Sequence, residues 1–227
     1  MMIKMSALAA IAIALAAVGV TPASATLIKY TFEGEVTNII SDDTGQVGTA
    51  GITAGTTFSG QFQYDTSAVL TTLVGTLIAV YPGISNDVTF NTGGAGVVVQ
   101  SSSSRVVIAN QHPSLNDRAV FAGDGLTSAN FTYDDSYAFS VDLQDTTQMV
   151  FDSLDLPTTA LLLSDFDLIS FNIRGLTIAG GEDNFTGTIT ALTADIPAVP
   201  VPAALPLFLS GLLGLGVMAR CRKQKAA

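Results

Sequence analysis

Residues 27–36 read LIKYTFEGEV, and the pattern in this stretch decides the fold class. Ile28, Tyr30 and Phe32 alternate with charged or hydroxyl-bearing side chains. Successive side chains of a β-strand point to opposite faces, so this alternation places one face on an apolar core and the other in water. That arrangement is typical of antiparallel sheets.

The same two-residue period recurs along the middle of the chain. TFSGQFQYD (57–65) and YAFSVDLQD (137–145) repeat it clearly. Turn-forming clusters of Gly, Asn, Asp and Ser separate the segments. Further strands are expected at 86–91, 96–100, 105–109, 148–152, 167–173 and 184–193. We therefore predict an all-β fold, a single antiparallel β-sandwich domain of jelly-roll type.

Three details refine this prediction. SSSS (101–104) is expected to be a loop between two strands, and TTALLLSDF (158–166) a short helix or a loop over the sandwich edge. A Phe-x-Gly-x-apolar pattern occurs at 32–36, 58–62 and 185–189. Glycine inside a strand indicates a bulge or a close approach of neighbouring groups.

The N-terminus has the organisation of a secretory signal peptide. Residues 1–25 contain one early charge, an uncharged apolar run, and Ala23-Ser24-Ala25 at the end. Small residues at Ala23 and Ala25 suit the peptidase pocket, so cleavage is expected to leave Thr26 as the first residue of the mature protein. The alternative is a retained N-terminal membrane helix.

The expected exported domain, 26–196, is strongly acidic. It holds all 19 acidic residues of the chain and four of its nine basic residues, giving a formal net charge of −15. Such a field repels nucleic acids and anionic lipid surfaces, so no nucleic-acid partner is expected. The single cysteine, Cys221, lies outside the domain, which excludes a disulfide, a cysteine nucleophile and a thiolate metal site within it.

The sequence of the domain offers no enzymatic machinery. Its one histidine, His112, stands in a polar stretch before Pro113, without a Gly-x-Ser-x-Gly elbow anywhere in the chain. One histidine without cysteine also argues against a zinc site. Carboxylate pairs suited to glycoside hydrolysis exist, but the chain lacks tryptophan, which commonly provides a sugar platform. We therefore expect a protein that is not an enzyme.

Calcium is the one cofactor left open. Ca²⁺ takes carboxylate and carbonyl oxygens, and two acidic loops could supply them, although neither has EF-hand spacing. These loops contribute Asp134 and Asp135 in FTYDDS (131–136), and Glu182 and Asp183 in AGGEDN (179–184). Acidic turns that simply keep the domain soluble explain the same residues without a metal.

The C-terminal segment, 197–227, contains VPVPAALPLFLSGLLGLGVMARCRKQKAA from residue 199 onward. Its prolines predict an extended linker over 197–204, followed by a hydrophobic helix over 205–219. Fifteen residues span about 22 Å, which is short for a membrane helix. The positive charges of the basic tail 220–225 are expected to hold this end of the chain in the cytoplasm. Its charges are Arg220, Arg222, Lys223 and Lys225.

This order of elements resembles the PEP-CTERM sorting signal, and more closely its Val-Pro-Leu-Pro-Ala variant. The positions that match the motif are Val199, Pro200, Val201, Pro202, Ala203 and Ala204. Val201 departs from the commonest form, which has Glu there, and Cys221 interrupts the basic run without an assigned role.

The resemblance implies an exported protein of a Gram-negative bacterium. Its partner would be an exosortase-type membrane enzyme, with the C-terminal helix held transiently in the inner membrane. The released domain would reach the cell surface or the extracellular matrix, in association with exopolysaccharide. A glycan- or calcium-binding module at the cell surface is the alternative function, and a plain C-terminal membrane anchor is the alternative for the tag.

Overall fold

The computed structural model describes residues 26–93, 96–128, 138–176 and 181–196. The predicted signal peptide, Asp134 and Asp135, and the whole predicted sorting signal, including its helix and Cys221, lie outside the described residues. The described residues all belong to one compact unit, Ala25–Pro197.

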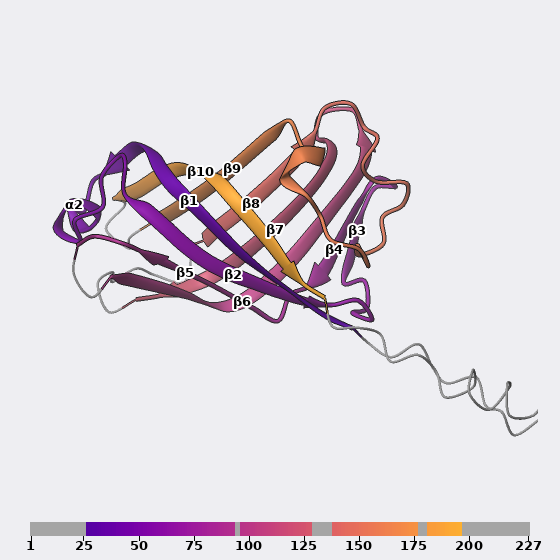
Figure 1. Cartoon of the computed structure of the whole chain (residues 1–227), viewed down its shortest axis with the longest axis horizontal. Helices are drawn as coiled ribbons and strands as arrows, with labels where there is room; N and C mark the ends of the chain where they lie inside the picture. Colours follow the sequence, from indigo (N-terminus) through magenta and orange to yellow (C-terminus); the bar gives the residue numbers. More distant parts are fainter. Residues whose placement is uncertain (1–25, 94–95, 129–137, 177–180, 197–227) are drawn as a thin grey trace, which may run out of the picture. The chain divides into compact units, whose positions relative to one another are not determined.

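The described part of the chain is built almost entirely from antiparallel strands (Figure 1). A one-turn helix, α2 (Gln46–Thr49), and a 3₁₀ turn, η1 (Leu163–Asp165), are its helical elements. The strands are β1 (Leu27–Asp42), β2 (Thr57–Asp65), β3 (Thr72–Val74), β4 (Ile78–Pro82), β5 (Ser85–Phe90), β6 (Val97–His112), β7 (Asn116–Thr127), β8 (Ala138–Asp145), β9 (Leu168–Leu176) and β10 (Glu182–Asp195).

The sheet closes on itself, so the predicted β-sandwich is wrong and the fold is an eight-stranded barrel. Neighbouring strands follow the order β6-β5-β2-β1-β10-β9-β8-β7, and β7 pairs again with β6. β4 and β3 extend from β6 as two outer strands. A sandwich keeps two separate sheets with free edges, whereas closure pairs the edges of one continuous sheet.

Strand β6 makes this closure possible because it is long enough to change neighbours. Val97–Gln100 pair with β5, Arg105–Ala109 pair with β4, and the opposite edge pairs with β7. The predicted loop over Ser101–Ser104 is therefore wrong, since these serines continue the strand. They stand where β6 leaves β5, and the Ser101 hydroxyl donates to the Asn86 carbonyl oxygen of β5 at 3.2 Å.

Aromatic rings fill the inside of the barrel. Phe62 and Phe121 stack with ring centroids 3.8 Å apart, and Phe58 lies 4.3 Å from Phe171. Tyr30 stacks on Phe62 at 4.9 Å. Offset and edge-on ring pairs stabilise a core beyond the area that they bury. The interior is thus a packed core, and the apolar positions of the alternating pattern supply it.

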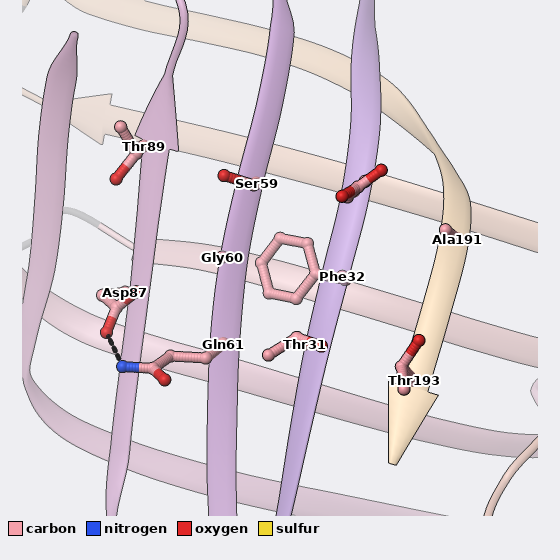
Figure 2. Close-up of a pocket in the computed structure, with 10 residues that line it drawn as sticks. Thr31, Phe32, Ser59, Gly60, Gln61, Asp87, Thr89, Ala191 and Thr193 are labelled. Atoms are coloured by element: carbon pink, nitrogen blue, oxygen red, sulfur yellow. Dashed lines mark hydrogen bonds between the residues drawn. The ribbon is translucent and has the colours of Figure 1, made fainter. Parts of the chain in front are cut away.

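The Phe-x-Gly repeats mark close approaches across adjacent strands, as predicted. The Phe32 ring of β1 lies beside Gly60 of β2 (Figure 2), and the Phe58 ring of β2 occupies the space beside Gly34 of β1. A side chain at either glycine would occupy the volume that the opposite phenylalanine fills. The repeat therefore lets large rings pack against a strongly bent wall.

The segment 146–167 covers one end of the barrel core, shown in orange near β3 and β4 in Figure 1. The predicted strand at 148–152 is wrong, because these residues belong to this cap. Tyr64 and Tyr81 donate hydrogen bonds to carbonyl oxygens of the cap, both at 2.9 Å, and the Leu161 amide donates to the Tyr30 hydroxyl at 2.9 Å. Buried side chains of the cap complete the core: Phe151, Leu156, Leu161 and Phe166.

Candidate functional site

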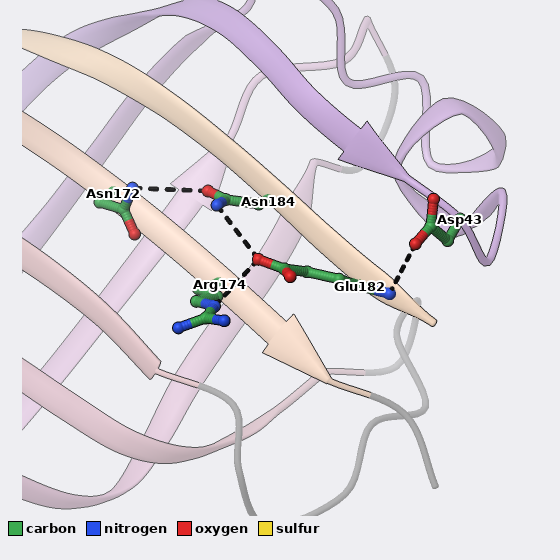
Figure 3. A network of polar contacts seen from close by, with 5 residues as sticks. All are labelled: Asp43, Asn172, Arg174, Glu182 and Asn184. Carbon is green, nitrogen blue, oxygen red and sulfur yellow. Dashed lines mark hydrogen bonds and ion pairs between the residues drawn. The ribbon is translucent and has the colours of Figure 1, made fainter. Parts of the chain in front are cut away.

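The acidic residues Glu182 and Asp183 do not form a common site. They are neighbours in β10, so their side chains leave opposite faces of the strand. Asp183 is fully buried and accepts hydrogen bonds from the Thr44 amide, at 3.1 Å, and from the Thr44 hydroxyl. The Glu182 carboxylate accepts from Arg174 at 2.9 Å and from Asn184 at 3.3 Å (Figure 3). Among the described residues, no three His, Cys, Asp or Glu side chains are grouped as metal ligands.

The acidic turn after β1 is used for structure. The Asp42 carboxylate accepts from the Val47 and Gly48 amides at 3.0 and 2.9 Å, which holds the start of α2. Asp43 accepts from the Glu182 amide at 3.0 Å and so joins this turn to β10 (Figure 3). Carboxylates that accept backbone N–H groups fix loops, which is a role that acidity alone does not reveal.

Two further predicted residues have local roles. His112 ends β6, and its Nδ1 accepts from the Ser114 and Leu115 amides at 3.2 and 3.1 Å, which closes the turn to β7. Thr26, the predicted mature N-terminus, lies beside Thr66, with its amide 3.2 Å from the Thr66 hydroxyl.

A concave site lies on the outer wall of β6, β7, β8 and β9. All three arginines of the domain line it, although they come from three different strands. We call this site, of about 350 Å³, the arginine hollow. Its lining residues are Arg105, Val107, Ala109, Leu115, Arg118, Val120, Ala122, Ala138, Phe139, Ser140, Asn172 and Arg174.

Strand register explains how the hollow forms. Arg105 of β6, Ala122 of β7, Ser140 of β8 and Asn172 of β9 are consecutive cross-strand partners in one row. The next row places Ala138 beside Arg174. Three small side chains of these rows, Ala122, Ser140 and Ala138, leave space beside the long arginines, and Asp124 of β7 is the partner of Ala138 in the second row.

Each arginine also has a carboxylate partner, and the three pairs differ in kind. Arg118 makes a two-pronged contact with Asp142, in which Nε lies 2.7 Å from one carboxylate oxygen. Its side chain is 28% exposed. Arg105 contacts Asp124 at 2.7 Å and is 48% exposed, and Arg174 contacts Glu182 at 2.9 Å and is 58% exposed.

These differences decide which arginines are available. An exposed pair held through one nitrogen contributes roughly 0–1 kcal/mol, whereas a two-pronged, partly buried pair is geometrically fixed. Arg118 is therefore part of the wall. Arg105 and Arg174 can exchange partners at little cost.

A second groove lies on the other half of the wall, across β10, β1, β2 and β5 (Figure 2). It encloses about 330 Å³ and contains no arginine or lysine. The Gln61 amide donates to the Asp87 carboxylate within it. Most of its other outward-facing side chains are hydroxyl-bearing: Thr31, Ser59, Thr89 and Thr193.

Sequence reasoning missed the arginine hollow because no local motif encodes it. Positions 105, 118 and 174 are far apart, and only the register of four strands gathers them. One signal was present: the domain has four basic residues, and these three fall on outward positions of strands.

The two grooves present hydrogen-bond donors and acceptors. Within the described ranges, the one histidine is used in a turn and no cysteine is present, so neither groove combines a nucleophile with an imidazole or thiolate. In the same ranges, no helix is long and apolar enough to cross a bilayer. No family model, curated protein or solved structure matches this chain.

Proposed function

We propose that the chain is a non-enzymatic protein of the cell surface or extracellular matrix of a Gram-negative bacterium. The single observation that carries this proposal is the C-terminal order of Pro-x-Pro motif, apolar run and basic tail over 199–227. The signal-like residues 1–25 add an export route. The tag would be recognised by an exosortase-type enzyme while its helix stays transiently in the inner membrane.

The fold supports a binding or structural role for the exported domain. The aromatic core fills the barrel interior, and several carboxylates that could have served catalysis hold loops instead, Asp42 and Asp183 among them. The outer wall with its two grooves offers surface for recognition.

Intact mass of the protein recovered from cells tests this proposal. A mature chain that begins at Thr26 and ends near Pro202, found outside the inner membrane, is the expected result. A C-terminus that extends to Ala227 in the surface fraction would contradict processing, and would favour a plain membrane anchor.

The alternative function is a glycan- or calcium-binding module. The arginine hollow favours the glycan arm, because it offers hydrogen-bond donors and acceptors around an apolar floor. The calcium arm is tested by thermal unfolding in millimolar Ca²⁺. A specific ligand raises the unfolding midpoint, so an unchanged midpoint would count against a calcium site.

A further inference from the structure

We propose that the arginine hollow binds a neutral, hydroxyl-rich oligosaccharide. The inference rests on the proposed function, since it places the domain among cell-surface glycans, and it assigns the ligand class and the residues. Arg105 and Arg174 are the principal donors, Ser140 lies on β8 between their strands, Asn172 lies on β9 two residues before Arg174, and aliphatic side chains form the floor.

The dimensions suit an extended ligand. β6 and β9 are separated by three strand spacings, or about 14 Å between the backbones that carry Arg105 and Arg174. Ala138 and Ser140 of β8 lie between these strands and keep the centre open. The hollow therefore has long polar side chains at its two sides and small side chains at its centre.

The hydrogen-bonding groups of the hollow suit a ligand that carries hydroxyl groups better than a ligand that carries one charged group. Arg174 uses Nε for Glu182, and its two terminal nitrogens bond to no other described residue. Asn172 donates to Asn184 through a long contact of 3.5 Å, which a ligand oxygen can replace (Figure 3). The guanidinium donors of Arg105 and Arg174 therefore lie next to the carboxylate acceptors of Asp124 and Glu182. A hydroxyl both donates and accepts, so a polyol satisfies both kinds of group at once.

The charge distribution selects a neutral ligand. Three guanidinium groups in the hollow are matched by Asp124, Asp142 and Glu182, so the site is locally neutral. The surrounding domain carries a formal charge of −15 and repels polyanions at long range. An acidic polysaccharide would have to approach against this field, whereas a neutral chain is not repelled by it.

The floor supplies the apolar contact that a sugar ring requires. Val107 of β6, Val120 of β7 and Ala138 of β8 are partly exposed and line the hollow. Small-ligand sites combine an apolar surface with a few placed polar groups, and the C–H face of a pyranose fits such a surface.

The experiment uses the exported protein as it accumulates in culture. Isothermal titration measures binding of neutral hexaoses, namely β-1,4-, β-1,3- and α-1,4-linked glucose, with hexagalacturonate as an acidic probe of equal length. We expect at least one neutral hexaose to bind with a Kd at or below about 1 mM. Its affinity should be nearly independent of salt, since no counterions are released.

Two variants and one matched control assign the site. Arg105→Gln combined with Arg174→Gln is expected to weaken binding about tenfold or more, which corresponds to about 1.4 kcal/mol. Ala138→Phe keeps all three ion pairs but fills the hollow, and is expected to abolish binding. Lys29→Gln removes a positive charge from β1, outside the hollow, and is expected to leave the affinity unchanged.

Three results would overturn the proposal. The first is that no neutral hexaose binds the folded protein at 10 mM, which is roughly ten times the expected Kd. The other two are that hexagalacturonate binds more tightly than every neutral hexaose, or that the hollow variants bind as well as the Lys29→Gln control. Thermal unfolding of each variant establishes that it is folded. Export is measured separately by fractionation and intact mass, so failure of the binding proposal and failure of the proposed function are distinguishable.

Discussion

Replacing Gly60 by alanine tests how the barrel wall is built. A Cβ atom at this position would lie 2.3 Å from Cζ of Phe32 and 2.3 Å from the backbone oxygen of Asp87. The Phe32 ring cannot swing away freely, because Phe58, Phe62 and Phe171 surround it with centroids 6.1–6.3 Å away. The backbone oxygen belongs to β5 and is fixed by the sheet.

The expected cost follows from these distances. Carbon atoms pack best at about 3.5–4.0 Å, so both contacts overlap by more than about 1 Å. Overpacking of a core costs roughly 1–3 kcal/mol, and this position should reach about 3 kcal/mol. Alanine recovers about 0.5–1 kcal/mol by restricting the unfolded chain. The net loss is about 2 kcal/mol, or a fall in Tm of about 6 °C for a domain of this size.

Urea and thermal unfolding of the protein measure this loss. Ser59→Ala is the matched control, since Ser59 is the adjacent, exposed residue of β2 and its change should stay within about 0.5 kcal/mol. Adding Phe32→Leu to Gly60→Ala should recover part of the cost, so the two changes should be non-additive. A Gly60→Ala variant as stable as the parent, or more stable, would refute the reasoning.

Three other predictions concern buried polar groups. Asp117→Ala removes the acceptor of two backbone N–H groups, including that of Phe151 at 2.9 Å, and should cost about 3 kcal/mol in urea unfolding, with Asp117→Asn costing less. Tyr64→Phe removes the bond to Pro157 and should cost about 1 kcal/mol while raising hydrogen exchange in the cap. Burial raises the pKa of Asp145, but hydrogen bonds from the turn after it outweigh burial and lower that pKa overall. The stability that Asp145 contributes is therefore present above the ordinary carboxyl pKa of about 4, and it is lost as pH falls through the lowered pKa. Urea unfolding at pH 6 and at pH 3 should show a smaller loss of stability for Asp145→Asn than for the parent.

The strands were predictable because their burial alternates residue by residue. The segment 57–65 is β2 to the residue, and the apolar members of its pattern, Phe58, Phe62 and Tyr64, all lie in the core. Barrel closure was not predictable in the same way. It depends on how far β6 continues and on register shifts in β1, such as the one at Glu33 and Gly34. Alternation is the same in a sandwich and in a barrel, so it cannot distinguish them.

Segments without strict alternation were the ones misread. Ser101–Ser104 have turn-forming composition, but pairing with β7 on one edge keeps them in β6. The opposite error occurred at 148–152, where Val150 and Phe151 suggested a strand. There the Asp117 and Asp145 carboxylates accept backbone N–H groups that a sheet ladder would otherwise satisfy. Tertiary partners of this kind are invisible in a local pattern.

The acidity of the domain divides into two roles that the sequence alone could not separate. Asp117, Asp145 and Asp183 are almost fully buried, and each accepts hydrogen bonds from backbone N–H groups of a loop or turn. These carboxylates fix the loops and turns at the ends of the barrel and so stabilise the fold. A partner meets the charges of the outer wall, and these are unevenly distributed. All three arginines lie over β6, β7 and β9, and none lies in the hydroxyl-rich groove of β10, β1, β2 and β5. In the arginine hollow the three guanidinium groups are balanced by their carboxylate partners, so a ligand meets a locally neutral region there, and a discriminating contact with the domain is best placed at this site.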